Sequence, residues 1–122
     1  MPKTISKITR RARRKRSPGA APSLPYESWL IGQLRSPAEA AAYLEAVIEE
    51  GDQSAIMLAL RQIAQARGGV AEIARKAKLT REATYKMLSK SGNPELRSLT
   101  AVLEATGLRI AVKPIEKEKK AA

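Results

Sequence analysis

The sequence predicts an all-α domain that ends in one short β-strand. Apolar residues recur at helical spacing through the middle of the chain, and residues typical of helix ends separate these runs. Alanine accounts for 21 of the 122 residues, whereas the chain has no Phe, one Trp and three Tyr. A core of small and branched aliphatic side chains favours closely packed helices over an aromatic-rich sheet.

Composition excludes several kinds of chemistry. The chain has neither His nor Cys, which removes disulfides, His/Cys zinc sites and His-dependent catalytic triads. Glu49, Glu50 and Asp52 are too few acidic residues for a metal cluster, so we expect no enzyme, no metal and no cofactor. No stretch approaches the roughly 18 consecutive apolar residues of a membrane span, and no apolar segment follows the basic N-terminus. We therefore expect a cytoplasmic protein.

Charge is distributed unevenly along the chain. The formal net charge is +11, from 23 Lys and Arg against 12 Asp and Glu. Residues 1–26 hold eight basic residues and no acid, residues 27–66 hold two basic and six acidic residues, and residues 67–112 hold nine basic and four acidic residues. A soluble chain this basic usually meets a polyanion, and the acidic stretch predicts a second, different partner.

We divide the chain into a disordered basic arm (1–25), a helical domain (26–112) and a charged tail (113–122). The arm offers little that can be buried, because prolines and glycine follow its basic run. The candidate phosphate contacts in it are Arg10, Arg11, Arg13, Arg14, Lys15 and Arg16. The alternatives for the arm are an adjacent DNA minor groove, nonspecific polyanion binding, or a solvated tail.

The first half of the domain contains two well-marked helices after a short apolar cluster. That cluster, expected to form a helical turn or two, comprises Tyr26, Trp29, Leu30, Ile31 and Leu34. Ser36-Pro37-Ala38-Glu39 is a capping box with Pro at the first helical position. The apolar stripe that follows is Ala40, Tyr43, Leu44, Val47 and Ile48, ended by Gly51. Asp52 caps the next stripe, which is Ile56, Ala59, Leu60, Ile63 and Ala64, ended by Gly68-Gly69.

Three shorter helices and a strand complete the domain. The first stripe is Val70, Ile73, Ala74 and Ala77, and Thr80 caps the second helix, which closes near Ser91-Gly92. Asn93-Pro94 opens the third, which carries Leu96, Leu99, Val102 and Leu103 and stops at Gly107. Leu108, Ile110 and Val112 then alternate with polar or small residues as a strand. An unpaired strand edge favours pairing with a second copy, so we expect a homodimer.

Residues 71–88 have the layout of two helices joined by a tight turn. In a helix-turn-helix, the N-terminal residues of the second helix reach base edges in the major groove of double-stranded DNA. An Arg pairs with guanine there, and a Glu accepts from cytosine. The candidates for this helix are Thr80, Arg81, Glu82, Tyr85 and Lys86. The candidate phosphate contacts around it are Arg75, Lys76, Lys78 and Lys90.

Three positions in this unit leave alternatives open. Lys78 stands where many such units have Gly in a left-handed conformation, and Thr84 stands where an apolar residue is common. Tyr85 is either a core residue, a phosphate contact or a stacking partner of a thymine methyl. The simpler alternative for the whole stretch is an ordinary pair of amphipathic bundle helices.

Several short runs together point to one family. They are Tyr43-Leu44 with Glu50-Gly51-Asp52, Ala59-Leu60 with Ala66-Arg67-Gly68, Leu79-Thr80-Arg81-Glu82, Tyr85-Lys86-Met87-Leu88-Ser89, Gly92-Asn93-Pro94 and residues 99–108. With these runs, residues 26–112 resemble the HigA-like addiction-module antidote proteins, type II antitoxins with a Cro/repressor-type helix-turn-helix. The resemblance implies a five-helix, lambda-repressor-like domain with an N-terminal helical extension. It also implies a dimer that binds a RelE/ParE-like toxin and represses its own operon.

Toxins of that class are small and basic, so an acidic surface suits them. The acidic candidates are Glu39, Glu45, Glu49, Glu50 and Asp52. Tyr26, Trp29 and Leu30 are the candidate anchors, because interface hot spots favour aromatic residues; the alternatives are solvated faces and packing within the domain. The expected function is a DNA-binding antitoxin, and the alternatives are an RNA- or ribosome-associated protein or a regulator without a toxin.

Overall fold

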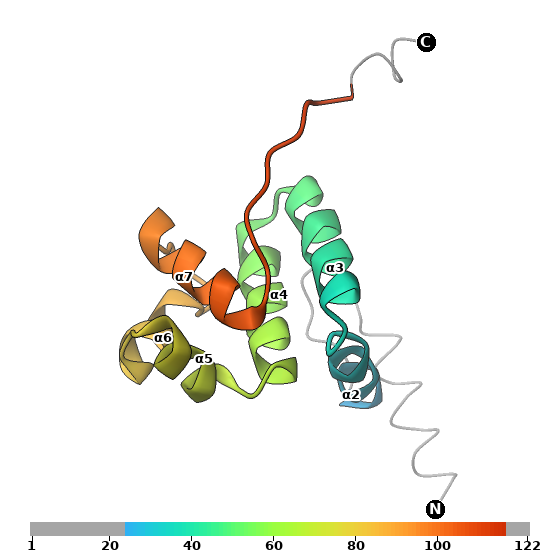
Figure 1. Ribbon diagram of the computed structural model, residues 1–122. Coiled ribbons are helices and arrows are strands. Elements are labelled where there is room, and N and C mark those ends of the chain that lie inside the picture. The colour runs from blue at the N-terminus through green and yellow to red at the C-terminus, as the bar shows by residue number, and fades with distance from the viewer. Residues whose placement is uncertain (1–23, 117–122) are drawn as a thin grey trace, which may run out of the picture.

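The computed structural model describes residues 24–116, and every regular element among them is a helix. The elements are α2 (Leu24–Gln33), α3 (Pro37–Glu50), α4 (Gln53–Ala66), α5 (Val70–Ala77), α6 (Arg81–Met87) and α7 (Leu96–Thr106). α3 and α4 form an antiparallel pair, and α5, α6 and α7 lie on the other side of α4 (Figure 1). The predicted all-α class is therefore confirmed.

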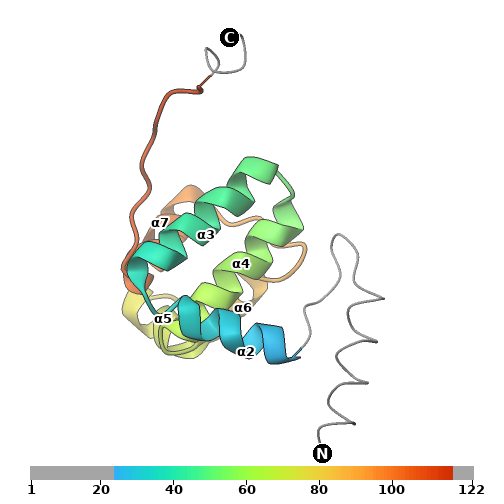
Figure 2. The ribbon, with the colours of Figure 1, turned by 90° about the vertical axis from the view of Figure 1, so that its right-hand side faces the viewer.

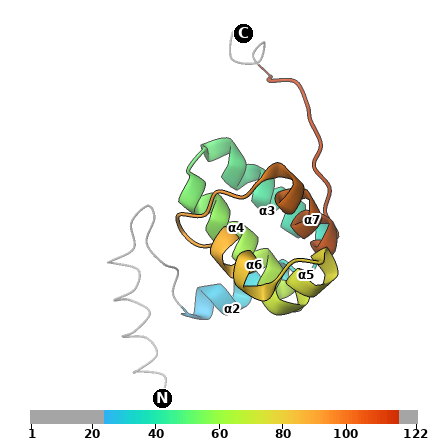
Figure 3. The same ribbon diagram turned by 90° about the vertical axis from the view of Figure 1, so that its left-hand side faces the viewer.

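α4 is the helix against which both halves of the domain pack. Its residues Ala59, Ile63 and Ala64 are completely buried. One core cluster joins α4 to α2 and α3 and also includes Leu88, after α6, and Leu103 of α7. α2 lies across the lower ends of α3 and α4 (Figure 2). A second cluster joins Ala64 to Val70, Ile73 and Val102, from the helices that stand in front of α4 in Figure 3. The acidic half (residues 27–66) and the basic half (residues 67–112) thus both pack against one central helix.

Side-chain caps begin three of the helices at the predicted places. The Ser36 hydroxyl accepts a hydrogen bond from the Glu39 amide at 3.3 Å. The Asp52 carboxylate accepts one from the Ser54 amide at 3.2 Å, and the Thr80 hydroxyl accepts one from the Ala83 amide at 3.0 Å. Because each cap satisfies an amide that has no partner within its helix, the sequence pattern locates these N-termini closely.

The predicted C-terminal strand is wrong for the single chain. Residues 108–116 are extended, but a strand also needs a neighbour with which to exchange backbone hydrogen bonds. Leu108 donates to the Leu103 carbonyl at 2.9 Å, and no backbone–backbone hydrogen bond between loops or turns in the described chain involves residues 109–116. Ile110, Val112 and Ile115 are exposed along this segment.

Other element boundaries differ from the sequence prediction. α2 has 10 residues, more than the one or two turns expected, and it starts one residue before the predicted end of the arm. The rest of the arm, including residues 10–16, and the tail from residue 117 lie outside the described residues. α7 starts at Leu96 rather than at Pro94. The residues before it are extended, and Gln53 ties this loop to α4 by donating to the Gly92 carbonyl at 2.7 Å.

Two residues of the predicted apolar stripes face solvent. Ile48 on α3 is 52% exposed and Leu96 on α7 is 71% exposed. α3 packs mainly against α4, so a single partner helix covers its stripe and leaves the edge of that stripe open. Leu96 is the first residue of α7, where the helix starts beyond the loop.

Candidate functional site

The turn between α5 and α6 consists of Lys78, Leu79 and Thr80. Lys78 adopts a left-handed conformation with φ 62° and ψ 40°, which most side chains avoid. The Lys78 amide donates to the Arg75 carbonyl at 3.1 Å, and the Leu79 amide donates to the Ala74 carbonyl at 2.9 Å. These bonds close α5, while Leu79 packs against the second core cluster. The tight turn therefore forms with Lys in the place where Gly is common.

α6 has one buried face and one exposed polar face. Thr84 and Leu88 are completely buried. The Thr84 hydroxyl donates to the Thr80 carbonyl at 2.8 Å, which explains how a polar residue occupies a position where an apolar one is common. The rest of the helix surface exposes Arg81, Glu82, Tyr85 and Lys86. Tyr85 is 52% exposed, so the core interpretation of this residue is wrong.

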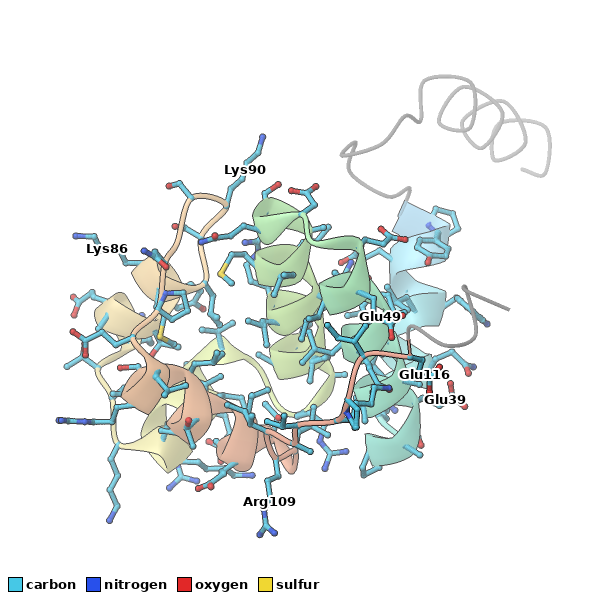
Figure 4. The ribbon with its side chains drawn as sticks, turned by 90° about the horizontal axis from the view of Figure 1, so that it is seen from above. Glu39, Glu49, Lys86, Lys90, Arg109 and Glu116 are labelled. Atoms are coloured by element: carbon cyan, nitrogen blue, oxygen red, sulfur yellow. The ribbon has the colours of Figure 1, made fainter. Side chains whose placement is uncertain are left out.

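The basic residues around α6 lie in separate places. The Arg75 guanidinium lies 2.5 Å from the Glu72 carboxylate, and this hydrogen bond lowers the pKa of Glu72. Lys76 and Lys78 line a groove against α7, next to Glu104. Lys86 lines a different groove, formed with the loop that precedes α7. Figure 4 shows Lys86 and Lys90 pointing away from the body of the molecule, on the side opposite to Glu39 and Glu49.

A groove of about 370 Å³, which the sequence does not predict, lies beside Tyr85 of α6. It is lined by Arg61 and Gln65 of α4, by the start of α5, by Tyr85 and by the acidic Glu27 of α2. Gly69 precedes α5 and supplies no side-chain cap, so the first-turn amides of that helix are not satisfied by a capping side chain. Arg61 also donates a hydrogen bond to the Leu88 carbonyl at the end of α6. The Gly68-Gly69 pair was the sequence signal for an uncapped helix start.

A second groove, of about 320 Å³, lies between α2 and α3. Trp29 is 58% exposed beside it, Tyr26 is 37% exposed, and their ring centroids are 5.8 Å apart. Leu30, the third predicted anchor, is only 5% exposed and belongs to the core cluster of its own chain. Among these three residues, only the two aromatic ones offer substantial surface to a partner.

The predicted acidic residues are all exposed, and some already have partners within the chain. They are Glu39, Glu45, Glu49, Glu50 and Asp52. The Glu45 carboxylate lies 2.6 Å from the Lys113 amine, which raises the pKa of Lys113, and Asp52 caps α4. The acidic residues on α3 therefore form a surface that the extended C-terminal segment partly neutralises.

A buried hydrogen-bond network connects the three helices of the acidic half. The Gln62 side chain on α4 accepts from the Tyr43 hydroxyl at 2.6 Å and donates to the Glu27 carboxylate at 3.3 Å. Burial raises the pKa of Tyr43, and the neighbouring Tyr26 and Glu27 raise it further. This network holds the Tyr43 ring in place at the wall of the aromatic groove.

Residues 24–116 contain no group of three or more acidic side chains placed to hold a metal ion. In the same range, no helix has the length and apolar character that crossing a bilayer requires.

Comparison with known proteins places the chain in a family. Residues 30–114 match the model of a family described as "Probable addiction module antidote protein". The chain is also 38% identical over 79 residues to an uncharacterized protein of Haemophilus influenzae, covering 65% of this chain and 80% of that protein. No solved structure shows significant similarity. Because the family match extends from α2 past the end of α7, the chain belongs to the addiction-module antidote family.

Proposed function

We propose that this chain is an antitoxin that neutralises a small basic toxin of the RelE/ParE class and represses its own operon by binding operator DNA. Membership of the antidote family supports an antitoxin role with a cognate toxin as partner. An antidote acts by binding, which agrees with the expectation that the chain is not an enzyme. The proposals on DNA, on the toxin surface and on dimerisation rest on the residues themselves.

The exposed polar face of α6 carries the DNA-binding proposal. Arg81, Glu82 and Tyr85 are exposed on a short helix that the buried Thr84 and, just past its end, the buried Leu88 anchor to the core. This arrangement is what a helix needs in order to enter a major groove without disturbing its own core. In this proposal Arg81 reads guanine and Glu82 reads cytosine.

Groups beside α6 supply positions for phosphates. The first residues of α5 and Arg61 line the groove next to Tyr85. Helix N-termini and guanidinium groups both bind phosphate oxygens well. Lys86 and Lys90 extend the basic surface on one side, and such contacts fix the position of the protein on DNA without reading its sequence.

Footprinting on the DNA upstream of the chain's own gene tests this function. We expect a discrete protected palindrome, with half-sites about one helical turn apart if two copies bind together. Scrambled DNA and structured RNA of equal length serve as competitors. Equal affinity for all three would contradict operator recognition and favour the RNA- or ribosome-associated alternative.

The toxin surface in this proposal comprises Trp29 and Tyr26 together with the acidic side chains on α3. Exposed aromatic residues are frequent interface hot spots, and the carboxylates would steer a basic partner. The test is binding to the product of the neighbouring gene by the full chain. Trp29→Ala should weaken this binding, whereas Leu96→Ala, which truncates an even more exposed apolar residue on α7, should not. Absence of any binding by the unaltered chain would favour a regulator without a toxin.

The extended segment 108–116 carries the dimer proposal. Its exposed residues Ile110, Val112 and Ile115 have high β-propensity, and pairing with the same segment of a second copy would satisfy its backbone groups. Val112→Pro removes one donor and should yield a monomer in light scattering, whereas Val112→Thr should stay dimeric. A dimeric Val112→Pro variant would place the contact elsewhere.

A further inference from the structure

Three of the four aromatic side chains of this protein line one open groove. The chain has one Trp, three Tyr and no Phe. Trp29, Tyr26 and Tyr43 all line the groove between α2 and α3, and only Tyr85 lies elsewhere. Trp29 is more than half exposed there, although a large aromatic ring is normally well covered. This concentration indicates a surface built for contact rather than for the core.

The chemistry of the groove suits a guanidinium group. Its lining includes the buried residues Leu30 and Leu34 and the exposed residue Glu39, and among residues 24–116 neither Lys nor Arg lines it. The faces of Trp and Tyr rings attract cations, and Arg stacks on such rings more often than Lys does. Because Glu39 lines the same groove as the rings, it adds a charge opposite to that of a stacked Arg.

An occupant with this chemistry precedes α2 in the same chain. Residues 10–16 contain six basic side chains, five of them Arg. Eight residue steps separate Arg16 from the start of α2 at Leu24. Such a stretch reaches up to about 27 Å when extended, which exceeds the rise of about 8 Å along the helix between Leu24 and Trp29. A tether of this length keeps the arm at an effective concentration in the millimolar range.

We propose that an Arg of residues 10–16 docks in this groove of its own chain, with its guanidinium against the Trp29 ring and beside Glu39. The docking itself requires neither DNA nor a toxin. One consequence does rest on the proposed function: a docked arm covers Trp29 and Tyr26, so a toxin has to displace it. DNA phosphates compete for the same Arg side chains, which links occupancy of the groove to DNA binding.

Trp29 is the only Trp of the chain, so its fluorescence reports on the groove alone. The experiment measures acrylamide quenching of Trp29 in the full chain at low and at high salt. Because salt screens exposed charges, we expect the quenching constant to rise about twofold at high salt as the arm leaves. A variant with Arg11→Gln, Arg13→Gln and Arg14→Gln should show the higher constant at both salt concentrations.

A matched control removes three positive charges from the other end of the chain. The variant with Lys117→Gln, Lys119→Gln and Lys120→Gln should behave like the unaltered protein. Glu39→Gln should raise quenching at low salt while the arm is intact. Circular dichroism confirms that each variant keeps its helices.

Three results would overturn the proposal. The first is a low-salt quenching constant in the arm variant equal to that of the unaltered chain. The second is an equal change in the arm and tail variants, which would show an effect of net charge alone. The third is a change that depends on protein concentration, which would place the arm of a second copy in the groove. Since the assay contains neither DNA nor toxin, its failure would leave the proposed function standing.

Discussion

The Tyr43 hydroxyl donates a 2.6 Å hydrogen bond to the side-chain oxygen of Gln62, which is only 2% exposed. This bond joins α3 to the middle of α4, and the same amide reaches Glu27 on α2. A buried amide loses its water on folding, so its stability depends on the partners that replace that water.

We expect Tyr43→Phe to lower the free energy of unfolding by about 1–2 kcal/mol, because it leaves the Gln62 oxygen without its donor. Urea denaturation followed by circular dichroism measures this. Tyr85→Phe is the control, since Tyr85 is 52% exposed and should change stability by less than about 0.5 kcal/mol. Equal effects of the two substitutions would contradict the role of the Tyr43–Gln62 bond.

The contribution of Tyr43 to the free energy of unfolding should also depend on pH in the alkaline range. Burial, Tyr26 and Glu27 raise the pKa of Tyr43 above its ordinary value of 10.0, so the folded chain holds this proton more tightly than the unfolded chain. The stability that results is fully present below the unfolded pKa and is lost as pH rises through the folded pKa. The free energy of unfolding should therefore fall more steeply above about pH 10 in the unaltered protein than in Tyr43→Phe. Lys113, whose pKa Glu45 raises, contributes equally in both proteins, so parallel pH profiles would exclude a Tyr43 contribution.

Two glycines should respond to alanine in opposite directions. A Cβ on Gly92 would lie 2.0 Å from the Met87 carbonyl oxygen, a backbone atom, so Gly92→Ala should destabilise the fold by about 2–3 kcal/mol. A Cβ on Gly32, inside α2, would meet nothing within 4 Å, so Gly32→Ala should stabilise it by about 0.5–1 kcal/mol. Thermal unfolding distinguishes them, and a neutral Gly92→Ala would mean that the loop before α7 moves at little cost.

Lys78 and Lys76 should also respond in opposite directions when each is replaced by Gly. Lys78→Gly relieves a conformation that costs a non-Gly residue about 1–2 kcal/mol, and part of this gain is offset by the flexibility of Gly in the unfolded chain. We expect a net stabilisation of about 0.5–1 kcal/mol. Lys76→Gly removes the same charge from within α5 and should destabilise by about 1 kcal/mol. If both variants lost stability, strain at Lys78 would be excluded.

On the proposed function, Arg81→Ala should weaken binding to the operator by about 1–3 kcal/mol and relax the base preference at one position. Arg97→Ala removes an equal charge from an exposed position on α7 and controls for nonspecific attraction. Gel-shift titration with operator and scrambled duplexes measures the affinity for the operator and the nonspecific affinity. Unchanged discrimination in Arg81→Ala would remove this residue from base reading.

Local signals predicted most of the fold. The Ser36, Asp52 and Thr80 caps act within three residues of themselves, so the sequence contains all the information that they need. Glu95, by contrast, starts α7 without a side-chain cap, because the position of this start depends on a loop that is tied to Gln53 on α4. The prediction of a strand at 108–112 is wrong for a related reason. Alternation of apolar with polar or small residues shows which residues could form a strand, but it does not supply the neighbouring strand.

The candidate site was only partly predictable. Helical periodicity separates the exposed Glu82 and Lys86 from the buried Thr84 and Leu88. It places Arg81, three residues before Thr84, near the buried side, so the exposure of Arg81 is known only from the packed structure. The aromatic groove does not follow from helical periodicity, because Tyr43 lies on α3 and meets Tyr26 and Trp29 only through the packing of α2. The predicted anchor Leu30 directly follows the exposed Trp29, and only the packed structure shows that the Leu30 side chain is buried in the core.

Because α4 is central to the fold, the two proposed binding surfaces should be lost together when the protein unfolds. Each core cluster draws residues from this helix, so loss of α4 would dismantle both at once. Neither half should persist as a working fragment after the other is lost. On the proposed function, a cell that degrades this protein would therefore release the toxin and the operator in the same event.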